Sequence, residues 1–472
     1  MRKTTIIGFA SAVLVVILGG LLTAYTDLAH CSEGEREVPC PAAERVSDTF
    51  VFAHKPMSAN GSITVHVAAL TGTLTYPPPG RDAIVPGLVP WAKGGIIIKD
   101  GTGQGSPYVA LMRTAEHGVR LQYAYTHDLA GSPDATWLRL TREGDTVIGY
   151  DSMDGREWTE IGRTRIPDLP ATVETGMFAT SPGWLGLRTV ALGASVAESG
   201  FTQASATFDT ITTTGTPTAP WTPAIIGDLG HTDWEKHHRA PGMTESAGTV
   251  TVTGSGDIGP QGDGGARDIE DTLVALALGL LIVLVMSTRA NTAPVTLAAM
   301  AFGAGLIAAG ATIPLGVRLL RANGNTVNAA SVLTELRVIV GVGVLFALAA
   351  LFARALAVRL HRRRLAILVA VAVVVVPYLL AAFPLLPDVV AGWLLRLTPA
   401  AGFAVVGTTP EYSQVAAHYV PSGGYFPLPW WGGLLVLAAW TAIVMVGRVR
   451  RVSFSRGSDG RTGQGRSNGS AE

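Results

Sequence analysis

The sequence is short of charged residues. Only 15% of its 472 residues are Asp, Glu, Lys or Arg, and the mean hydropathy is positive. Soluble globular chains carry charge on about 25% of their residues. The totals therefore indicate a membrane protein with a water-soluble part, and the length predicts more than one domain.

The second half of the chain lacks lysine and has very little acid. Between Thr272 and Gly457 every Lys or Arg position is Arg, and the carboxylates are Glu335, Asp388 and Glu411. The arginines lie at the ends of apolar runs, where membrane proteins carry their cytoplasmic positive charge. A basic surface for nucleic acid is not indicated, so no nucleic-acid partner is expected.

A phosphate-binding loop is also missing, because Gly-Lys-Ser/Thr occurs nowhere in the chain. The glycine-rich stretch 101–105 lies between two strand-like runs and is predicted to be a turn. No nucleophile and base can be paired from the sequence. The chain is therefore expected to be no enzyme and to carry no cofactor.

Cysteine is scarce as well. Cys31 and Cys40 follow the first apolar run closely, and in an oxidising compartment a disulfide that closes a small loop is the simplest interpretation. Lipid attachment at Cys31 is a weaker alternative, because His30 is bulky for that processing. A zinc ligand pair is weaker still, because the two cysteines are nine positions apart and no second pair is present.

Six apolar runs are present, and together they predict six transmembrane helices. Arg2 and Lys3 precede the first run, which fixes its start in the cytoplasm and favours an uncleaved anchor over a signal peptide. If the six helices cross the membrane in alternating directions, both termini lie in the cytoplasm, in agreement with the positions of the arginines. The runs span about 6–25, 272–286, 295–317, 338–352, 365–383 and 430–446.

Between the first two runs the composition changes to short alternating stretches with Gly, Asp and Pro between them, which predicts an all-β sandwich or jelly roll. The predicted division is a first helix at 1–25, an extracytoplasmic sandwich at 26–214, a second small β segment with linker at 215–270, the rest of the membrane domain at 271–450, and a disordered cytoplasmic tail at 451–472. Within the membrane domain, 389–407 is apolar but broken by Gly and Pro, so it is predicted to be re-entrant.

The β region resembles concanavalin A-like, laminin-G-like jelly rolls through GGIIIKDGTGQGSPYVALM, WLRLTREGDTVIGYDSMDGREWTEIG and PATVETGMFATSP followed by ASATFDTI. The resemblance implies a concave sheet face on which sugar could bind. We hypothesise that rings stack on the sugar there while polar groups bond its hydroxyls. The alternative is that the rings fill the core and that 126–128 is a surface turn. The residues of this hypothesis are Tyr123, Tyr125, Trp137, His127 and Asp128.

One polar cluster, HTDWEKHH, has donors that could take a divalent ion: His231, Asp233, Glu235, His237 and His238. A solvated loop is the preferred interpretation, so no metal site is expected.

The membrane part resembles the permease subunits of ABC-2 type transporters that carry a large extracytoplasmic domain. The matching stretches are AGLIAAGATIPLGVRLLRANG, TELRVIVGVGVLFALAAL with RLHRRR, WLLRLTPAAGFAV and YFPLPWWGGLLVLAAW. The resemblance implies six helices, a re-entrant element before the last, a separate cytoplasmic ATPase and a second permease subunit, identical or not. It also implies a coupling loop between the second and third helices, with Ser287, Arg289, Asn291 and Pro294.

Two classes of function follow. The first is an exporter permease in the cell membrane, in contact with membrane lipid and driven by the ATPase. The second is a membrane-anchored protein that senses or binds extracellular glycan. The broken segment favours the first class, while the absence of an amphipathic interface helix within Met1 to Thr5 favours the second.

Overall fold

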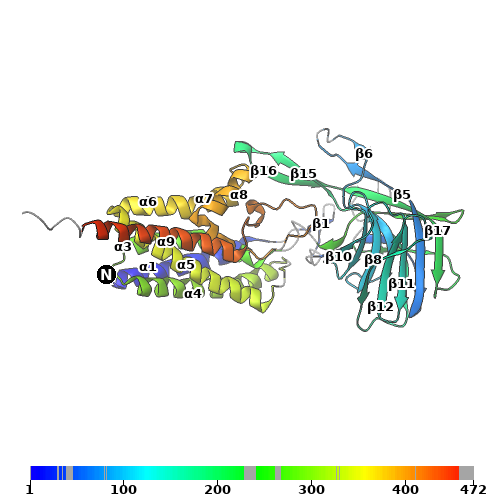
Figure 1. The fold of residues 1–472 in the computed structure, drawn as a ribbon, viewed down its shortest axis with the longest axis horizontal. Helices are drawn as coiled ribbons and strands as arrows, with labels where there is room; N and C mark the ends of the chain where they lie inside the picture. Colours follow the sequence, from blue (N-terminus) through cyan, green and yellow to red (C-terminus); the bar gives the residue numbers. More distant parts are fainter. Residues whose placement is uncertain are drawn as a thin grey trace, which may run out of the picture.

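The computed structural model describes residues 2–28, 31–33, 36–38, 46–78, 80, 82–227, 241–260, 267–325, 327–328, 330–409 and 411–455. These residues form two parts, shown in Figure 1: a bundle of helices at one end and an antiparallel β-sandwich at the other. The chain leaves the bundle after its first helix, builds the sandwich and returns for the remaining helices.

Every predicted apolar run is helical. The helices of the bundle are α1 (Arg2–Thr26), α3 (Leu276–Arg289), α4 (Pro294–Ala322), α5 (Val332–Leu360), α6 (Arg363–Val374), α7 (Val376–Ala382), α8 (Asp388–Leu397) and α9 (Trp430–Ser455). Short 3₁₀ helices are η2 (Ile269–Leu273), η3 (Pro399–Val406) and η4 (Pro421–Gly423).

Helix α5 lies at the centre of the bundle, in contact with α3, α4, α6 and α9. Glycines allow the close approach of neighbouring helices, because a Cβ placed on Gly305 of α4 would lie 2.7 Å from the Val342 carbonyl oxygen of α5. A Cβ on Gly279 of α3 would lie 2.3 Å from the Val16 side chain of α1. Small residues at such crossings are typical of membrane helices, where van der Waals packing drives association.

Four helices are long and apolar enough to cross a membrane: 3–26, α4, α5 and the continuous stretch 363–382 formed by α6 and α7. A fifth span results if the bent pair α8 and η3 counts as one. Helix α3 and residues 430–446 of α9 are apolar but shorter. Of the six predicted spans, four are thus matched by helices of sufficient length within the described part of the chain.

The sandwich consists of two antiparallel sheets whose facing sides bury one apolar core. The seven-stranded sheet has the order β10 (His127–Ala130), β9 (Val119–Tyr123), β8 (Tyr108–Thr114), β7 (Lys93–Lys99), β14 (Val173–Thr180), β4 (Phe50–Met57) and β18 (Thr222–Ile226). The eight-stranded sheet has the order β13 (Thr159–Arg165), β12 (Thr146–Ser152), β11 (Trp137–Glu143), β5 (Asn60–Thr75), β17 (Thr202–Thr214), β20 (Thr249–Gly254) and β19 (Gly242–Ser246), with β6 (Ile84–Pro86) paired to β5.

The predicted all-β sandwich is confirmed, but strands β18, β19 and β20 of the predicted second β segment, 215–270, belong to the two large sheets. Strand β18 joins the seven-stranded sheet beside β4, and β20 joins the eight-stranded sheet beside β17. The Pro- and Thr-rich stretch before β18 is therefore a connection between the two sheets. Composition alone could not show this, because a link inside a domain uses the same turn residues as a linker.

Strand β7 is buried along its whole length. One of its faces meets the core between the sheets, and the other meets a second apolar cluster that contains Ile97, Phe50 and Ile258. Burial of both faces explains the run of isoleucines from Ile96 to Ile98, since a strand with one solvent-exposed face would alternate apolar and polar residues.

Two structures connect the parts. Strands β3 (Val46–Asp48) and β21 (Ile258–Pro260) pair in an antiparallel ribbon that we call the stalk; β3 leads into the sandwich and β21 leads out of it. The hairpin β15 (Trp184–Thr189) and β16 (Ser195–Gly200), which we call the strap, extends along the molecule from the sandwich to α8 (Figure 1). A further ribbon pairs β1 (Cys31–Glu33) with β2 (Arg36–Val38).

Candidate functional site at the junction of bundle and sandwich

The broken segment between α8 and η3 is the most unusual element of the bundle. The two helices meet at an angle of 100°. The break is local in origin, because Thr398 is extended and precedes Pro399, a position that disfavours the helical conformation. All eight residues of η3 are buried. Irregular backbone is tolerated at membrane depth only when protein encloses it, and this segment meets that condition.

Tight packing holds η3 in place. A Cβ on Gly433 of α9 would lie 2.0 Å from the Ala401 carbonyl oxygen, and one on Gly341 of α5 would lie 2.1 Å from the Val405 side chain. Arg337 of α5 donates a hydrogen bond of 2.8 Å to the Gly407 carbonyl at the end of η3. Its guanidinium also lies over the Trp430 ring, 5.6 Å from the centroid. The broken segment is thus enclosed by α5 and α9 and capped by a cation.

A polar cluster lies where η3 ends; we call Asp268, Glu270, Asn328, Thr408 and Thr409 the η3-end cluster. The Thr408 amide donates to Glu270 Oε1 at 3.0 Å, and its hydroxyl bonds Oε2. The Thr409 hydroxyl lies 3.2 Å from Glu270 Oε1 and also bonds Asp268 Oδ2. Asn328 donates to Asp268 Oδ1 at 2.8 Å. Two carboxylates at the start of η2 therefore hold the end of the broken segment.

Burial raises the pKa of the Glu270 carboxyl, and the neighbouring Asp268 carboxylate raises it further. The bonds from Thr408 act in the opposite direction but are smaller. Burial likewise raises the pKa of Asp271, which reaches back to the Asp268 amide and closes a capping box for η2. At this corner of the bundle, burial therefore favours the protonated form of both carboxyls.

The tip of the strap docks on the start of α8. Asp388 Oδ2 accepts a hydrogen bond from the Ser195 hydroxyl of β16 and another, at 2.9 Å, from His418 Nε2. A Cβ on Gly193 would lie 3.2 Å from Pro387, so the backbone of the tip lies close to the helix start. One carboxylate thus joins the sandwich, α8 and the segment after η3.

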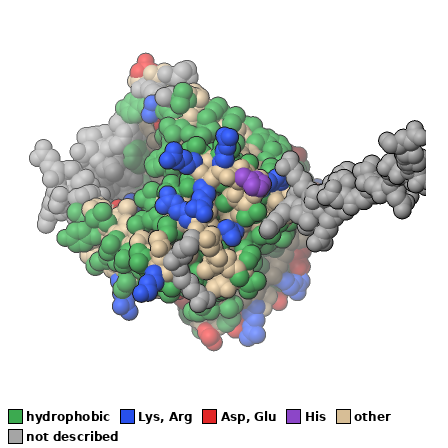
Figure 2. Space-filling view, turned by 90° about the vertical axis from the view of Figure 1, so that its left-hand side faces the viewer, with side chains coloured by type: hydrophobic (Ala, Val, Ile, Leu, Met, Phe, Trp, Pro, Cys, Tyr) green, Lys and Arg blue, Asp and Glu red, His purple; other side chains and the backbone are tan. Residues whose placement is uncertain are grey.

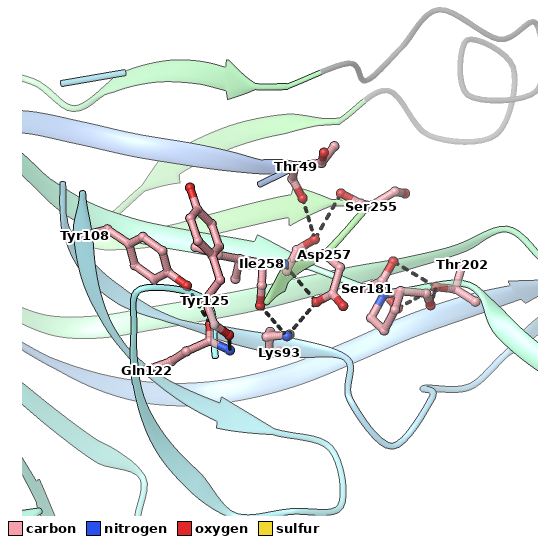
Figure 3. Close-up of polar contacts among 12 residues, drawn as sticks. Thr49, Lys93, Tyr108, Gln122, Tyr125, Ser181, Thr202, Ser255, Asp257 and Ile258 are labelled. Carbon is pink, nitrogen blue, oxygen red and sulfur yellow. Dashed lines mark hydrogen bonds and ion pairs between the residues drawn. The ribbon is translucent and has the colours of Figure 1, made fainter. Parts of the chain in front are cut away.

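The stalk is fixed to the seven-stranded sheet by two buried lysines of β7. Lys99 Nζ lies 2.9 Å from Asp48 Oδ2 and is fully buried, while Lys93 Nζ lies 2.6 Å from Asp257 and donates to the Ile258 carbonyl at 2.9 Å. Figure 3 shows Lys93 directed at Asp257 and Ile258. Burial lowers the pKa of Lys99, and the Asp48 carboxylate partly opposes the shift.

Aromatic and amide groups complete this attachment. Tyr125 donates to Asp48 Oδ2 at 3.1 Å. Gln122 accepts from Tyr108 at 3.1 Å (Figure 3). The Gly105 amide donates to the same Asp48 oxygen at 2.7 Å. The glycine-rich stretch 101–105 is a turn between antiparallel strands β7 and β8, as predicted, and it binds a carboxylate of the protein itself.

The five residues of the glycan hypothesis do not form one surface. Tyr123 stacks on His127 at 4.8 Å, and Asp128 forms a two-pronged ion pair with Arg120. Tyr125 belongs to the stalk attachment and packs edge-on against Tyr108. The turn at Ala124 and Tyr125, both at positive φ, removes Tyr125 from the alternation of its strand.

Trp137 lies in the other sheet, on β11. Its ring packs against His66 at 4.9 Å, and a Cβ on Gly155 would lie 2.8 Å from its Cδ2. The indole is therefore occupied by protein neighbours. The arrangement in which all five side chains share one concave face is absent from the described structure, because strand parity alone cannot tell which sheet a strand joins.

The predicted coupling loop is short, since α3 ends at Arg289 and α4 begins at Pro294. Arg289, Asn291 and Pro294 are exposed at the end of the bundle, whereas Ser287 is fully buried. Only the first three can meet a partner.

Three predictions concern residues outside the described ranges. One is the disordered tail at 451–472, of which the structure describes only 451–455, as the end of α9. Cys40 also lies outside these ranges, so the disulfide with Cys31 remains a prediction, and no disulfide lies within the described residues. The cluster from His231 to His238 is also outside them. Among the residues that the structure describes, no three His, Cys, Asp or Glu side chains are grouped as metal ligands.

Ser195, Asp268, Glu270, Thr408 and His418 were not singled out from the sequence. The available signal was weak: polar residues directly before and after apolar runs. Most of their partners are distant in the sequence; Ser195 and Asp388, for example, are 193 positions apart.

No family model and no curated protein matches the chain. One similar solved structure is a functionally unknown protein from Saccharomyces cerevisiae, with 13% sequence identity and a TM-score of 0.21. The match covers 35% of this chain and 74% of that one. At this level the likeness carries no argument about fold or function.

Proposed function

We propose that the chain is a membrane-spanning permease subunit of an ABC-2 type exporter, powered by ATPase subunits on the cytoplasmic side. The observation that carries the proposal is the broken pair α8 and η3, which is bent by 100° and enclosed by α5 and α9. A helix bundle that only anchors a sandwich needs no such element. A transport pathway does, because an interrupted helix brings backbone groups to the interior of the bundle.

In this proposal α1, α3, α4, α5, the α6–α7 stretch and α9 are the six spans. The two shorter ones would cross with the help of their flanking residues or in a thinned bilayer. Both ends of the chain lie in the cytoplasm, and the stalk and sandwich lie outside. The basic end of the bundle supports this orientation (Figure 2), since cytoplasmic loops are rich in Arg and Lys.

The η3-end cluster and the strap give the proposal a mechanism. Movement of η3 would pull on Glu270 through Thr408, and movement of α8 would pull on the strap through Asp388. The sandwich is thereby linked to the part of the bundle that would move during alternating access. ATPase subunits would act at the other end, on the loop with Arg289, Asn291 and Pro294, and a second permease subunit would complete the pathway.

Co-purification from the native membrane tests the proposal. A tagged chain should bring down an ATPase subunit, and the complex should hydrolyse ATP. Arg289→Glu should weaken the association, whereas Arg396→Glu, an exposed arginine on α8 at the opposite end of the bundle, should leave it intact. If no ATPase accompanies the wild-type chain, the proposal is wrong.

A second candidate is a membrane-anchored glycan-binding protein, and the exposed side of the eight-stranded sheet favours it. There the Arg139 guanidinium lies 3.8 Å from the Trp158 ring centroid, and His66 bonds Asp209 at 2.8 Å. Rings beside polar groups can stack on sugars and bond their hydroxyls. Glycan-array binding by the full chain in detergent, lost in Trp158→Ala and kept in Tyr125→Ala, would support this candidate.

A further inference from the structure

The turn between α5 and α6 gathers positive charge at one point. His361 closes α5 in the left-handed conformation, with φ of 54°, so the chain reverses at once. Arg362 is extended, and α6 begins at Arg363. Three consecutive arginines, 362 to 364, therefore project from a tight corner, and all three are exposed.

Nothing in the described protein neutralises this charge. The ion pairs among the described residues leave Arg362, Arg363 and Arg364 without a carboxylate partner. Figure 2 shows Lys and Arg side chains gathered, with His beside them, on this end of the bundle. Like charges so close together repel one another, so an anion bound among them lowers the energy.

The corner is also hollowed. An open depression of about 630 Å³ is lined by His361, the three arginines, Leu365 and Leu368. The two leucines are 43% and 66% exposed and lie three residues apart on one face of α6. The hollow therefore has a cationic rim at the end of the helix and an apolar wall along it.

We propose that this hollow binds an anionic phospholipid, with its phosphate held by Arg362, Arg363 and Arg364 and its acyl chains along Leu365 and Leu368. Guanidinium groups suit phosphate because they donate two parallel hydrogen bonds to its oxygens. The two leucines favour a lipid over an acidic protein segment as the ligand, because they offer an apolar surface to acyl chains. This surface continues along the apolar stretch 363–382, which is long enough to cross a membrane and where lipid chains would cover it. The inference does not depend on the transport function.

Native mass spectrometry after extraction from mixed vesicles tests the inference. The full chain is reconstituted in equal parts of phosphatidylglycerol and phosphatidylcholine, extracted in mild detergent, and its retained lipids are counted. The wild-type chain should retain phosphatidylglycerol in preference to phosphatidylcholine. The variant R362Q/R363Q/R364Q should lose most of that preference, by at least tenfold in the ratio of the two lipids.

The variant R318Q/R321Q/R396Q is the matched control, because it removes three exposed arginines from the other end of the bundle. It should retain phosphatidylglycerol as the wild-type chain does. Equal retention by all three proteins would overturn the proposal. So would loss of the lipid on addition of inorganic phosphate alone, because a free anion would then fill the hollow. Unchanged lipid retention in R362Q/R363Q/R364Q with loss of ATPase co-purification would identify a protein contact instead.

Discussion

His418 Nε2 lies 2.9 Å from Asp388 Oδ2, across the break between α8 and η3. The two residues are 30 positions apart, one at the start of α8 and the other in the segment that follows η3. The same carboxylate oxygen binds Ser195 at the tip of the strap. Asp388 therefore links the sandwich to the broken segment through hydrogen bonds.

Removal of this carboxylate should release the strap. Asp388→Ala deletes the acceptor of both hydrogen bonds, and bonds to a charged group contribute about 1.5–3 kcal/mol each. Backbone amides of β15 and β16 should then exchange hydrogen faster, as measured by mass spectrometry. Arg188→Gln, which removes the exposed pair with Glu198 on the same hairpin, should not change exchange at the tip. Equal protection in D388A and the wild-type chain would contradict the prediction.

The contact between η3 and α9 should tolerate no added methyl group. In Gly433→Ala the new Cβ would lie 2.0 Å from a backbone oxygen of η3, which cannot retreat as a flexible side chain would. Overpacking of this kind costs about 1–3 kcal/mol, so thermal unfolding in detergent should begin several degrees lower.

Gly303→Ala is the control, since a Cβ at this position on α4 meets nothing within 4 Å. It should be neutral or slightly stabilising, because Ala favours helix over Gly by about 1 kcal/mol. Equal effects of the two substitutions would show that η3 does not pack against α9 in this way.

Breaking the buried ion pair of the stalk should cost more stability than breaking a surface pair. Lys99→Met leaves the Asp48 carboxylate buried without its cation, a change that costs about 3–5 kcal/mol. Asp48→Asn in combination with Lys99→Met should recover most of the stability. Loss of the exposed pair in Arg163→Gln should leave the unfolding temperature of the sandwich unchanged. A small effect of Lys99→Met alone would contradict a structural role for the pair.

The Glu270 carboxyl should make stability depend on pH. Its pKa is raised in the folded chain, so the folded state keeps a proton that the unfolded state releases. Stability is therefore lost as the pH rises from the ordinary value of a glutamic acid through the raised one. Glu270→Gln cannot ionise and should lose less stability over that window. Unfolding temperatures of both proteins, measured at intervals from about pH 4.5 to 8, should diverge as pH increases, and parallel curves would contradict the prediction.

The predictable parts of the fold are those with a local signal. Alternating stretches gave strands and apolar runs gave helices, because both patterns depend on neighbours within a few residues. The break at Thr398 and Pro399 was also foreseeable, since it follows from the pair itself. The glycan hypothesis used the same alternation argument, and its five residues do not lie on one face of the structure. Alternation along a strand tells which of its residues share a face, but not which sheet the strand joins.

Contacts between distant segments had no such signal. Ser195 and Asp388 come from the sandwich and the membrane part, and Glu270 meets Thr408 across 138 residues. Each is an ordinary polar residue beside an apolar run, and only the fold brings them together. The role of β7 is similar: the sequence suggested a strand, but the contact of its lysines with the stalk depends on where β3 and β21 lie.

The stalk makes the sandwich a removable insert. Val46 is paired with Pro260, so the chain enters and leaves the sandwich at neighbouring points. A short turn could join these two positions, and the bundle would close without the 213 residues between them. A chain built in this way can acquire, exchange or lose its sandwich in one step while the order of the helices stays the same.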